Sequence, residues 1–510
     1  MDQTRWRGRK VTAELGTTTP GGYLLILAIL LPLAGIILSF TPGGRNAERA
    51  ALCSTPFGFA LACAIAFHVG QGGKPIVYAI GGLPPPLGIA LRADGISAVM
   101  LIAAAAIVTA AAFYARTKFA TPDGIRESRS ALTFWILLQA IWAALIIIFV
   151  GGDLFNLYVA LEILTFAAVP LVCIDGRAET LAAALRYLLF ALFGSISYLL
   201  GVALFYGAHG TLDISLLAQR VQATPVVWTA AALMTAGLLA KTALFPVHLW
   251  LPPAHANAPA AASAVLSGLV VKGSFFLTLR LWFYVLPALP TDKIAAVLGW
   301  LGSAAVIAGS IVALRQARLK LLIAYSTVAQ IGYLFLVFPL AAGAHAWSAI
   351  GWSAGLMQVL AHAFAKAAMF FSAGLLAEAL GHDQIARLGG AARVLPLTFL
   401  TIAVGGLSLM GLPPSGGFNA KWLMLQASIA SGQWLWTLPI LAGSLLAAGY
   451  VYRILAPALS DGEVSLELRP KRSHEMIALA LTAIAIALGF APQTFFNFLE
   501  IGHPVAAGLP

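Results

Sequence analysis

The sequence predicts an all-α membrane protein that crosses the bilayer about fourteen times. Of its 510 residues, 60% are hydrophobic and 10% are charged, whereas a soluble globular chain carries about 25% charged residues. Apolar runs of about 18 residues or more, the length that spans a bilayer, follow one another along almost the whole chain. Since no stretch longer than a short loop escapes these runs, no separate aqueous domain is expected.

The expected spans are separated by short polar loops. They lie near residues 23–40, 50–70, 95–115, 130–150, 153–174, 183–207, 226–250, 261–285, 294–314, 319–340, 346–380, 396–427, 434–457 and 475–498. The stretch 74–92 contains Gly81, Gly82 and three prolines, so a hairpin or interfacial loop is expected there. The basic N-terminal tail suggests a signal peptide, but no small-residue cleavage site is obvious, which favours a retained first helix.

Two of the runs are interrupted by helix-breaking residues. Pro246 and Pro252 fall in the seventh run, and Pro413 and Pro414 fall in the twelfth. Proline removes a backbone donor and clashes with the preceding turn, so both helices should split. The seventh and twelfth runs cross the membrane in opposite senses. Paired breaks in such positions are typical of transporters built from inverted repeats.

Ionisable residues stand inside several apolar runs. Glu162 lies in the fifth run, Lys241 in the seventh, Lys272 in the eighth and Lys421 in the twelfth. A charge at bilayer depth costs roughly 3 kcal/mol or more, so such residues usually face a polar interior and mark an ion path. We expect Glu162 to be the counter-ion of Lys241, and Lys272 to approach Lys241 from the next helix. The alternative for Glu162 is a structural carboxylate capped by hydroxyls.

Several histidines are further candidates for proton transfer. His362 and Lys366 stand at positions i and i+4 of one run, on the same helical face. Because histidine titrates near neutrality, this pair could relay protons between two half-channels. A buried histidine is otherwise more often a satisfied structural group. His248 and His255 flank the seventh-run break and either relay protons or bond to the carbonyls freed there.

The sequence lacks the motifs of electron or nucleotide chemistry. Its three cysteines form no CxxC pair or zinc-type spacing, and no GxGxxG or GxxxxGK[ST] sequence is present. We therefore expect no cofactor and no metal in this chain, and no nucleic-acid partner. If redox energy drives it, that energy must arrive from another subunit.

The distribution of basic residues predicts the orientation in the membrane. The formal net charge is +11, and most arginines and lysines follow odd-numbered runs. Those assigned to loops after even-numbered runs are Lys74, Arg92, Arg220, Arg280 and Lys293. Since cytoplasmic loops carry the excess of Lys and Arg, both termini are expected outside. The basic residues of the N-terminal tail argue the other way.

At these residues the chain resembles the antiporter-like family shared by respiratory complex I and the Mrp-type cation/proton antiporters. The matching segments are GGDLFNLYVALEI, AKTALFPVHLWLPPAHANAPAAASAVLSGLVVK, LKLLIAYSTVAQIGY, AHAFAKAAMFF and GLPPSGGFNAKW. They run from about residue 150 to 425, in order. The sequence GDLFNLYV looks most like the D-type subunits of the Mrp complexes and related hydrogenase-associated subunits.

The resemblance implies a fourteen-helix fold with two inverted five-helix units. The expected parts are a tail (1–22), N-terminal helices with the interfacial loop (23–129), the two repeats (130–285 and 294–457) and a C-terminal helix with its tail (475–510). By motif match, Glu162 and Lys241 are the charge pair, Lys272 is the eighth-helix lysine, and Lys421 is the twelfth-helix terminal site. His362 and Lys366 match the segment that links the two units.

The resulting prediction is a proton-translocating subunit of a multi-subunit Mrp-type Na⁺/H⁺ antiporter in the bacterial inner membrane. Its partners would be other membrane subunits, the lipid bilayer, protons and, as an open question, Na⁺. The alternative is a pump subunit of a redox enzyme, either an NADH:quinone oxidoreductase or a membrane-bound hydrogenase. A third interpretation is a structural scaffold whose charges merely tether partners.

Overall fold

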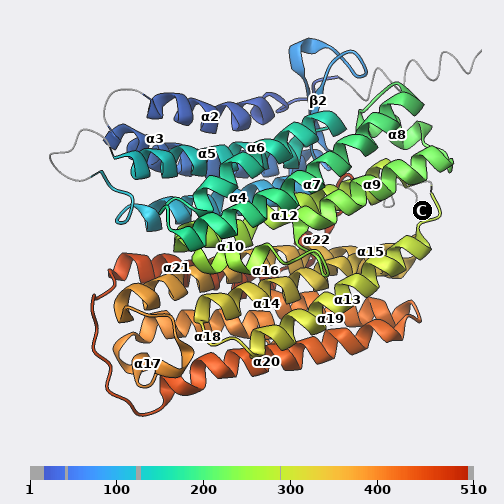
Figure 1. Ribbon diagram of the computed structural model, residues 1–510. Coiled ribbons are helices and arrows are strands. Elements are labelled where there is room, and N and C mark those ends of the chain that lie inside the picture. Colours follow the sequence, from blue (N-terminus) through green and yellow to red (C-terminus); the bar gives the residue numbers. More distant parts are fainter. Residues whose placement is uncertain (1–16, 41–43, 122–127, 288, 504–510) are drawn as a thin grey trace, which may run out of the picture.

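The computed structural model describes residues 17–40, 44–121, 128–287 and 289–503. Within these ranges, twelve helices are long and apolar enough to cross a membrane by length and composition, and the shorter helices α2 (Tyr23–Ser39) and α18 (Pro396–Met410) are also apolar. The prediction of a mostly helical, multi-span protein is confirmed. Figure 1 shows the helices α2 to α9 (blue to green) above the helices α13 to α21 (yellow to red), with α10, α12 and α16 between them.

The upper group follows the chain with short connections. Its helices are α3 (Gly44–Gly72), α4 (Gly95–Ala115), α5 (Arg129–Val150), α6 (Leu154–Val172), α7 (Ala178–His209), α8 (Ile214–Arg220) and α9 (Pro225–Thr242). Two short strands, β1 (Ile76–Ala79) and β2 (Ala90–Ala93), pair antiparallel between α3 and α4. Gly81 and Gly82 turn the intervening chain with positive φ angles. The hairpin predicted at 74–92 is confirmed.

The lower group begins after a fully buried, irregular span. This span consists of α11 (Ala260–Val265), η2 (Leu266–Val270), α12 (Val271–Leu279) and η3 (Arg280–Val285). The helices that follow are α13 (Asp292–Leu314), α14 (Leu319–Phe335), α15 (Val337–Ala341), α16 (Ala346–Leu380), α17 (Ala391–Val394), α19 (Gly416–Ala430), α20 (Thr437–Leu459), α21 (Arg472–Ala487) and α22 (Gln493–Leu499). Short 3₁₀ turns join several of them: η1 (Ile80–Gly82), η4 (Ile385–Arg387), η5 (Trp434–Trp436) and η6 (Leu488–Phe490).

Burial separates central helices from peripheral ones. The membrane-spanning windows of Ala260–Val285 and Ala346–Leu380 are 100% buried, whereas that of Arg45–Gly72 is 33% buried. Large apolar side chains on α7, such as Leu185, Leu189 and Phe193, are exposed at helical spacing, which is the pattern of a face turned to lipid or to a neighbouring subunit. Ionisable groups on α12 and α16 are therefore shielded from lipid by surrounding protein.

Both predicted helix breaks are present. Helix α9 ends at Thr242, where Ala243 adopts a left-handed φ of 59°, and helix α10 (Leu251–Asn257) resumes after the break. Helix α18 ends at Met410, where Gly411 has a φ of 79°. Helix α19 then starts under a cap in which the Ser415 hydroxyl accepts a hydrogen bond from the Phe418 N–H at 3.1 Å. Each break leaves carbonyl groups without helical partners.

One loop assignment was wrong. Arg280, counted among the loop cations, lies within the buried span at the start of the π-helical turn η3 and is 7% exposed. It is stabilised there because its guanidinium forms a bidentate pair with Asp94, at 2.5 and 2.8 Å. Asp94 also caps α4 by accepting from the Ser97 N–H.

Candidate functional site

Glu162 and Lys241 are brought together as predicted. The Lys241 ammonium lies 3.4 Å from the Glu162 carboxylate and donates to the Thr165 hydroxyl at 2.8 Å. The Ser195 hydroxyl from α7 donates to the same Glu162 oxygen, Oε1, that accepts from Lys241. Exposed fractions of 6% for the lysine side chain and 16% for the glutamate leave the pair mostly buried. The glutamate is therefore shared between an ammonium and a hydroxyl.

Close approach of α7 and α9 holds Lys241 in this position. A Cβ atom at Gly194 would lie 2.7 Å from the Gly237 carbonyl oxygen and 3.0 Å from Cγ of Lys241. Only a glycine therefore lets the two helices pack at this distance. The lysine stem is confined between α6 and α7.

A hydroxyl contact joins the segment that carries Lys241 to the segment that carries Lys272. Thr242, the residue after Lys241, contacts the Ser274 hydroxyl at 2.9 Å. Ser274 stands two residues after Lys272, whose fully buried ammonium donates to the Ser267 carbonyl in the π-helical turn η2. Single π turns inside α-helices occur frequently at functional sites because they displace backbone groups from regular pairing.

Four ionisable residues form a central cluster at α10, α12 and α16. Lys272 and Lys366 each interact electrostatically with both His255 and His362. Lys366 donates to the Ser326 hydroxyl and, at 2.9 Å, to the Ile323 carbonyl. The predicted pair of His362 and Lys366 thus lies close enough to Lys272 to interact electrostatically with it.

The two cluster histidines have open ring nitrogens. His255 and His362 are each 1% exposed, and among the described residues no hydrogen-bond partner reaches any of their four ring nitrogens. His255 stacks on Phe370 with the ring centroids 5.2 Å apart. An unpaired buried polar atom costs about 1–3 kcal/mol. These nitrogens are free to accept or donate a proton.

Two glutamines continue the chain of polar groups towards the second break. Gln358, one turn before His362 on α16, donates its amide to the Gln330 carbonyl oxygen at 2.8 Å. Gln330 in turn donates to the Leu409 carbonyl at 3.1 Å. That same carbonyl accepts a hydrogen bond from the Lys421 ammonium at 2.8 Å.

Lys421 occupies the space opened by the break between α18 and α19. Besides Leu409, it donates to the Met410 carbonyl at 3.1 Å and to the Ser444 hydroxyl at 3.0 Å. Its ammonium lies 4.4 Å from the ring centre of Tyr333. A Cβ atom at residue 411 would lie 2.6 Å from Cδ of Lys421, which explains why glycine stands there. The lysine satisfies the carbonyls that end α18.

One predicted residue stands apart, and several contributing residues were not predicted. His248 lies within the first break, between α9 and α10, and stacks on Phe245, and no described contact joins it to the cluster. The residues that the sequence interpretation overlooked are Thr165, Ser195, Ser267, Ser326, Thr327 and Gln330. In the run LKLLIAYSTVAQIGY, the polar residues at 326, 327 and 330 share one helical face, a signal that could have identified them.

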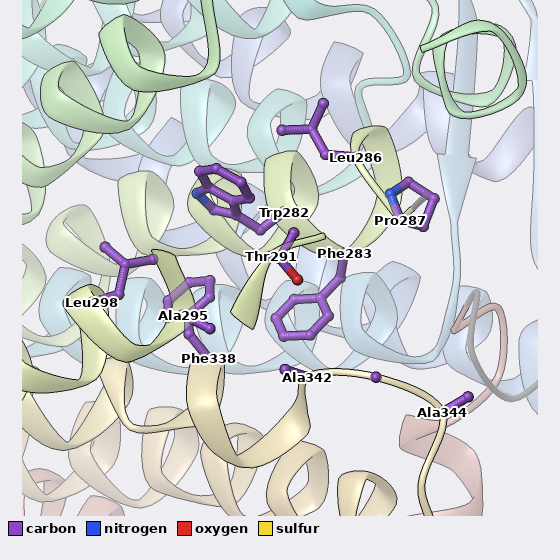
Figure 2. Close-up of a pocket in the computed structure, with 11 residues that line it drawn as sticks. Trp282, Phe283, Leu286, Pro287, Thr291, Ala295, Leu298, Phe338, Ala342 and Ala344 are labelled. Atoms are coloured by element: carbon purple, nitrogen blue, oxygen red, sulfur yellow. The ribbon is translucent and has the colours of Figure 1, made fainter. Parts of the chain in front are cut away.

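The structure also contains an apolar cavity away from these residues. Its volume is about 300 Å³, and Figure 2 shows Trp282, Phe283, Leu298 and Phe338 among the side chains that line it. The rings of Phe283 and Phe338 stack with their centroids 5.7 Å apart. None of the buried ionisable residues described above lines this cavity. Among the described residues, no three His, Cys, Asp or Glu side chains converge as a metal site requires.

The comparisons with known proteins agree with the motif resemblance. Residues 151–447 match the family model described as "NADH:quinone oxidoreductase/Mrp antiporter, TM". The chain is 34% identical over 482 residues to the NADH-quinone oxidoreductase subunit N of Desulforudis audaxviator, which covers 90% of this chain and 94% of that protein. It is 27% identical over 486 residues to the D-type subunit of the Na⁺/H⁺ antiporter of Alkalihalophilus pseudofirmus, with 93% and 95% covered.

A solved structure has the same fold. A chain in the Mrp complex from Dietzia sp. superposes with a TM-score of 0.84 at 23% identity, covering 96% of this chain and 99% of that one. The family model spans more than half of the 510 residues. The chain therefore belongs to the NADH:quinone oxidoreductase/Mrp antiporter transmembrane family, as an integral membrane protein with many spans.

Proposed function

We propose that this chain moves protons along the buried series of polar groups that runs from Glu162 to Lys421. The observation that carries the proposal is that this series of buried polar groups extends across both groups of helices. It passes through Lys241, Lys272 and Lys366 with hydroxyl, histidine or amide groups between them. Burying ionisable residues in a membrane costs free energy, so we interpret a series of them as functional.

The Glu162–Lys241 pair is the proposed switch. The carboxylate stabilises the protonated form of the lysine, and burial opposes it. If Glu162 moves towards Ser195, Lys241 loses its counter-charge and releases its proton. A change of only one contact distance is needed, since Glu162 already accepts from both groups.

The central cluster is the proposed relay. The free nitrogens of His255 and His362 exchange protons with Lys272 and Lys366, which surround them. Lys421 at the second break is the terminal proton carrier. For His248, which lies apart, we retain the proposal of a relay role at the mouth of the first break.

We propose that the fold consists of fourteen spans with two inverted five-helix repeats, 130–285 and 294–457, flanked by parts 1–22, 23–129 and 475–510. Each repeat contains one helix broken near a buried lysine, α9 before the break and α19 after it. Counting α2 and the α18–α19 pair as spans adds two to the twelve long helices. The excess of basic loop residues supports placement in a bacterial inner membrane with both termini outside.

The proposed assembly is an Mrp-type Na⁺/H⁺ antiporter, supported by the 27% identity to a D-type antiporter subunit over most of both chains. A second candidate is the pump arm of a redox enzyme. It is favoured by the 34% identity to a subunit named for NADH-quinone oxidoreductase. The proton path would be the same in both, and the energy source would differ.

Two experiments test these proposals. In the intact complex reconstituted in vesicles, Lys241→Ala should reduce proton flux by at least about tenfold, whereas undiminished flux would favour the scaffold interpretation. Mild-detergent purification of the tagged chain, followed by mass spectrometry, distinguishes the assemblies. Small membrane subunits alone indicate an antiporter, and peripheral flavin, iron–sulfur or metal-centre subunits indicate a redox enzyme.

A further inference from the structure

A basic pocket lies where three spans end. Its volume is about 760 Å³, and it opens between the start of α3, the end of α4 and the start of α21. Glu48 lines it and pairs with Arg116 at 3.0 Å. The cationic side chains in the lining are Arg45, Arg49, Arg116 and Lys471. After the Glu48 charge is subtracted, the described lining remains strongly positive.

Helix polarity adds to this positive charge. Helices α3 and α21 both begin at the pocket, and a helix N-terminus carries a partial positive charge. Helix α21 starts at Arg472, and its N-cap residue Lys471 provides no side-chain cap for the first backbone N–H groups in the described part of the chain. Both the side chains and the backbone therefore favour an anion.

An unpaired buried hydroxyl is an independent sign of a ligand. Thr121 lines the pocket and is 6% exposed, yet its hydroxyl has no hydrogen-bond partner among the described residues. Leaving such a group unpaired in a protein interior is unfavourable. Since the surrounding side chains are cationic, the hydroxyl is available as a donor to an anionic oxygen.

The lining of the pocket changes along the membrane normal, from cationic side chains at the span ends to apolar side chains further inside. Arg45 and Lys471 stand at the outer ends of their spans, and Arg116 directly follows Gly95–Ala115. The apolar lining residues Phe113 and Ile477 lie further inside the spans, and Phe113 is 40% exposed. A ligand with a charged head and an apolar tail matches both parts of the lining.

We infer that this pocket binds the phosphodiester headgroup of an anionic phospholipid. The phosphate contacts Arg49, Lys471 and the Thr121 hydroxyl, and the adjoining acyl carbons pack against Phe113. Basic pockets between transmembrane helices on the cytoplasmic side are suited to such headgroups, and this end of the spans is the one that the basic loops assign to the cytoplasm. Free phosphate shares the headgroup chemistry and lacks the apolar tail. The inference does not depend on the proton path.

Native mass spectrometry of the full-length chain in detergent tests the site directly. Wild-type protein is titrated with cardiolipin, phosphatidylglycerol and zwitterionic phosphatidylethanolamine. Arg49→Ala/Lys471→Ala should weaken cardiolipin binding roughly 25-fold, at about fivefold for each cation removed. The matched control, Arg186→Ala/Arg315→Ala, removes the same charge from residues outside the lining and should leave binding unchanged.

A second variant protects the test against misfolding. Thr121→Val keeps every charge and should weaken anionic-lipid binding by about fivefold, the value of one lost hydrogen bond. Equal binding by Arg49→Ala/Lys471→Ala and its control would overturn the inference. Full displacement of the lipid by millimolar inorganic phosphate would also overturn it and identify a site for free anions. Binding of an acidic partner segment with no lipid retained would contradict it as well.

Discussion

The side-chain amides of Gln358 and Gln330 hydrogen-bond to each other at 2.8 Å, and this contact joins the histidine-bearing helix α16 to α14. Through Gln330 it reaches the Leu409 carbonyl, which also accepts from Lys421. Helix α16 and the second helix break are thereby connected without a charged intermediate. An amide pair can transmit a change of hydrogen-bond direction while remaining neutral.

Replacing Gln330 by Leu should slow proton flux by roughly tenfold, because it removes the polar bridge while keeping a similar volume. Flux in vesicles that contain the intact complex measures the effect. Gln316→Leu is the matched control, since Gln316 donates to a carbonyl of its own helix. If both variants conduct equally, the amide bridge has no part in the path.

Gln358→Leu should have little additional effect when Gln330 is already replaced. The two residues act through one hydrogen bond, so their losses should be non-additive. A double-mutant cycle on proton flux gives the coupling. Independent, multiplying losses would show that the glutamines act separately.

Glu162→Gln should reduce flux by at least about tenfold, because the neutral amide cannot compensate the Lys241 ammonium. Glu378→Gln, at a side chain that is 45% exposed, provides the control. Unchanged flux in Glu162→Gln would mean that the carboxylate is structural.

Breaking the buried pair of Asp94 and Arg280 should destabilise the protein. The pair is not part of the proposed proton path, so this variant tests stability and not proton flux. Removing one partner of a buried ion pair costs about 3–5 kcal/mol, so Asp94→Leu should lower the thermal unfolding midpoint clearly. Replacing Arg280 by Met in the same chain should recover part of that loss, because no unpaired charge remains. Equal midpoints for wild type and Asp94→Leu would refute a stabilising role for the pair.

Site residues could be predicted from the sequence where placing them in an apolar run costs free energy. Glu162, Lys241 and Lys421 could be singled out because a charge in hydrocarbon needs compensation, and the breaks because proline cannot continue a helix. The amides of Gln330 and Gln358 cost less and gave no comparable signal.

Other features depend on tertiary packing, which cannot be predicted from sequence periodicity. Arg280 stands near a span end and was assigned to a loop, since its pairing with Asp94 far earlier in the chain is set by tertiary structure. The packing of α10, α12 and α16, which brings Lys272 within electrostatic reach of the two buried histidines, is likewise set by tertiary structure. The basic N-terminal tail, residues 1–16, lies outside the described residues.

The proposed proton path is tested most directly by measuring the proton flux after its central residue, Lys366, is replaced. Lys366 lies midway in the series, fully buried and bonded to Ser326. In the intact complex reconstituted in vesicles, Lys366→Leu should lower the rate of luminal pH change by at least about tenfold, while Lys118→Leu at an exposed lysine should not. Full flux through the Lys366→Leu complex would contradict the account.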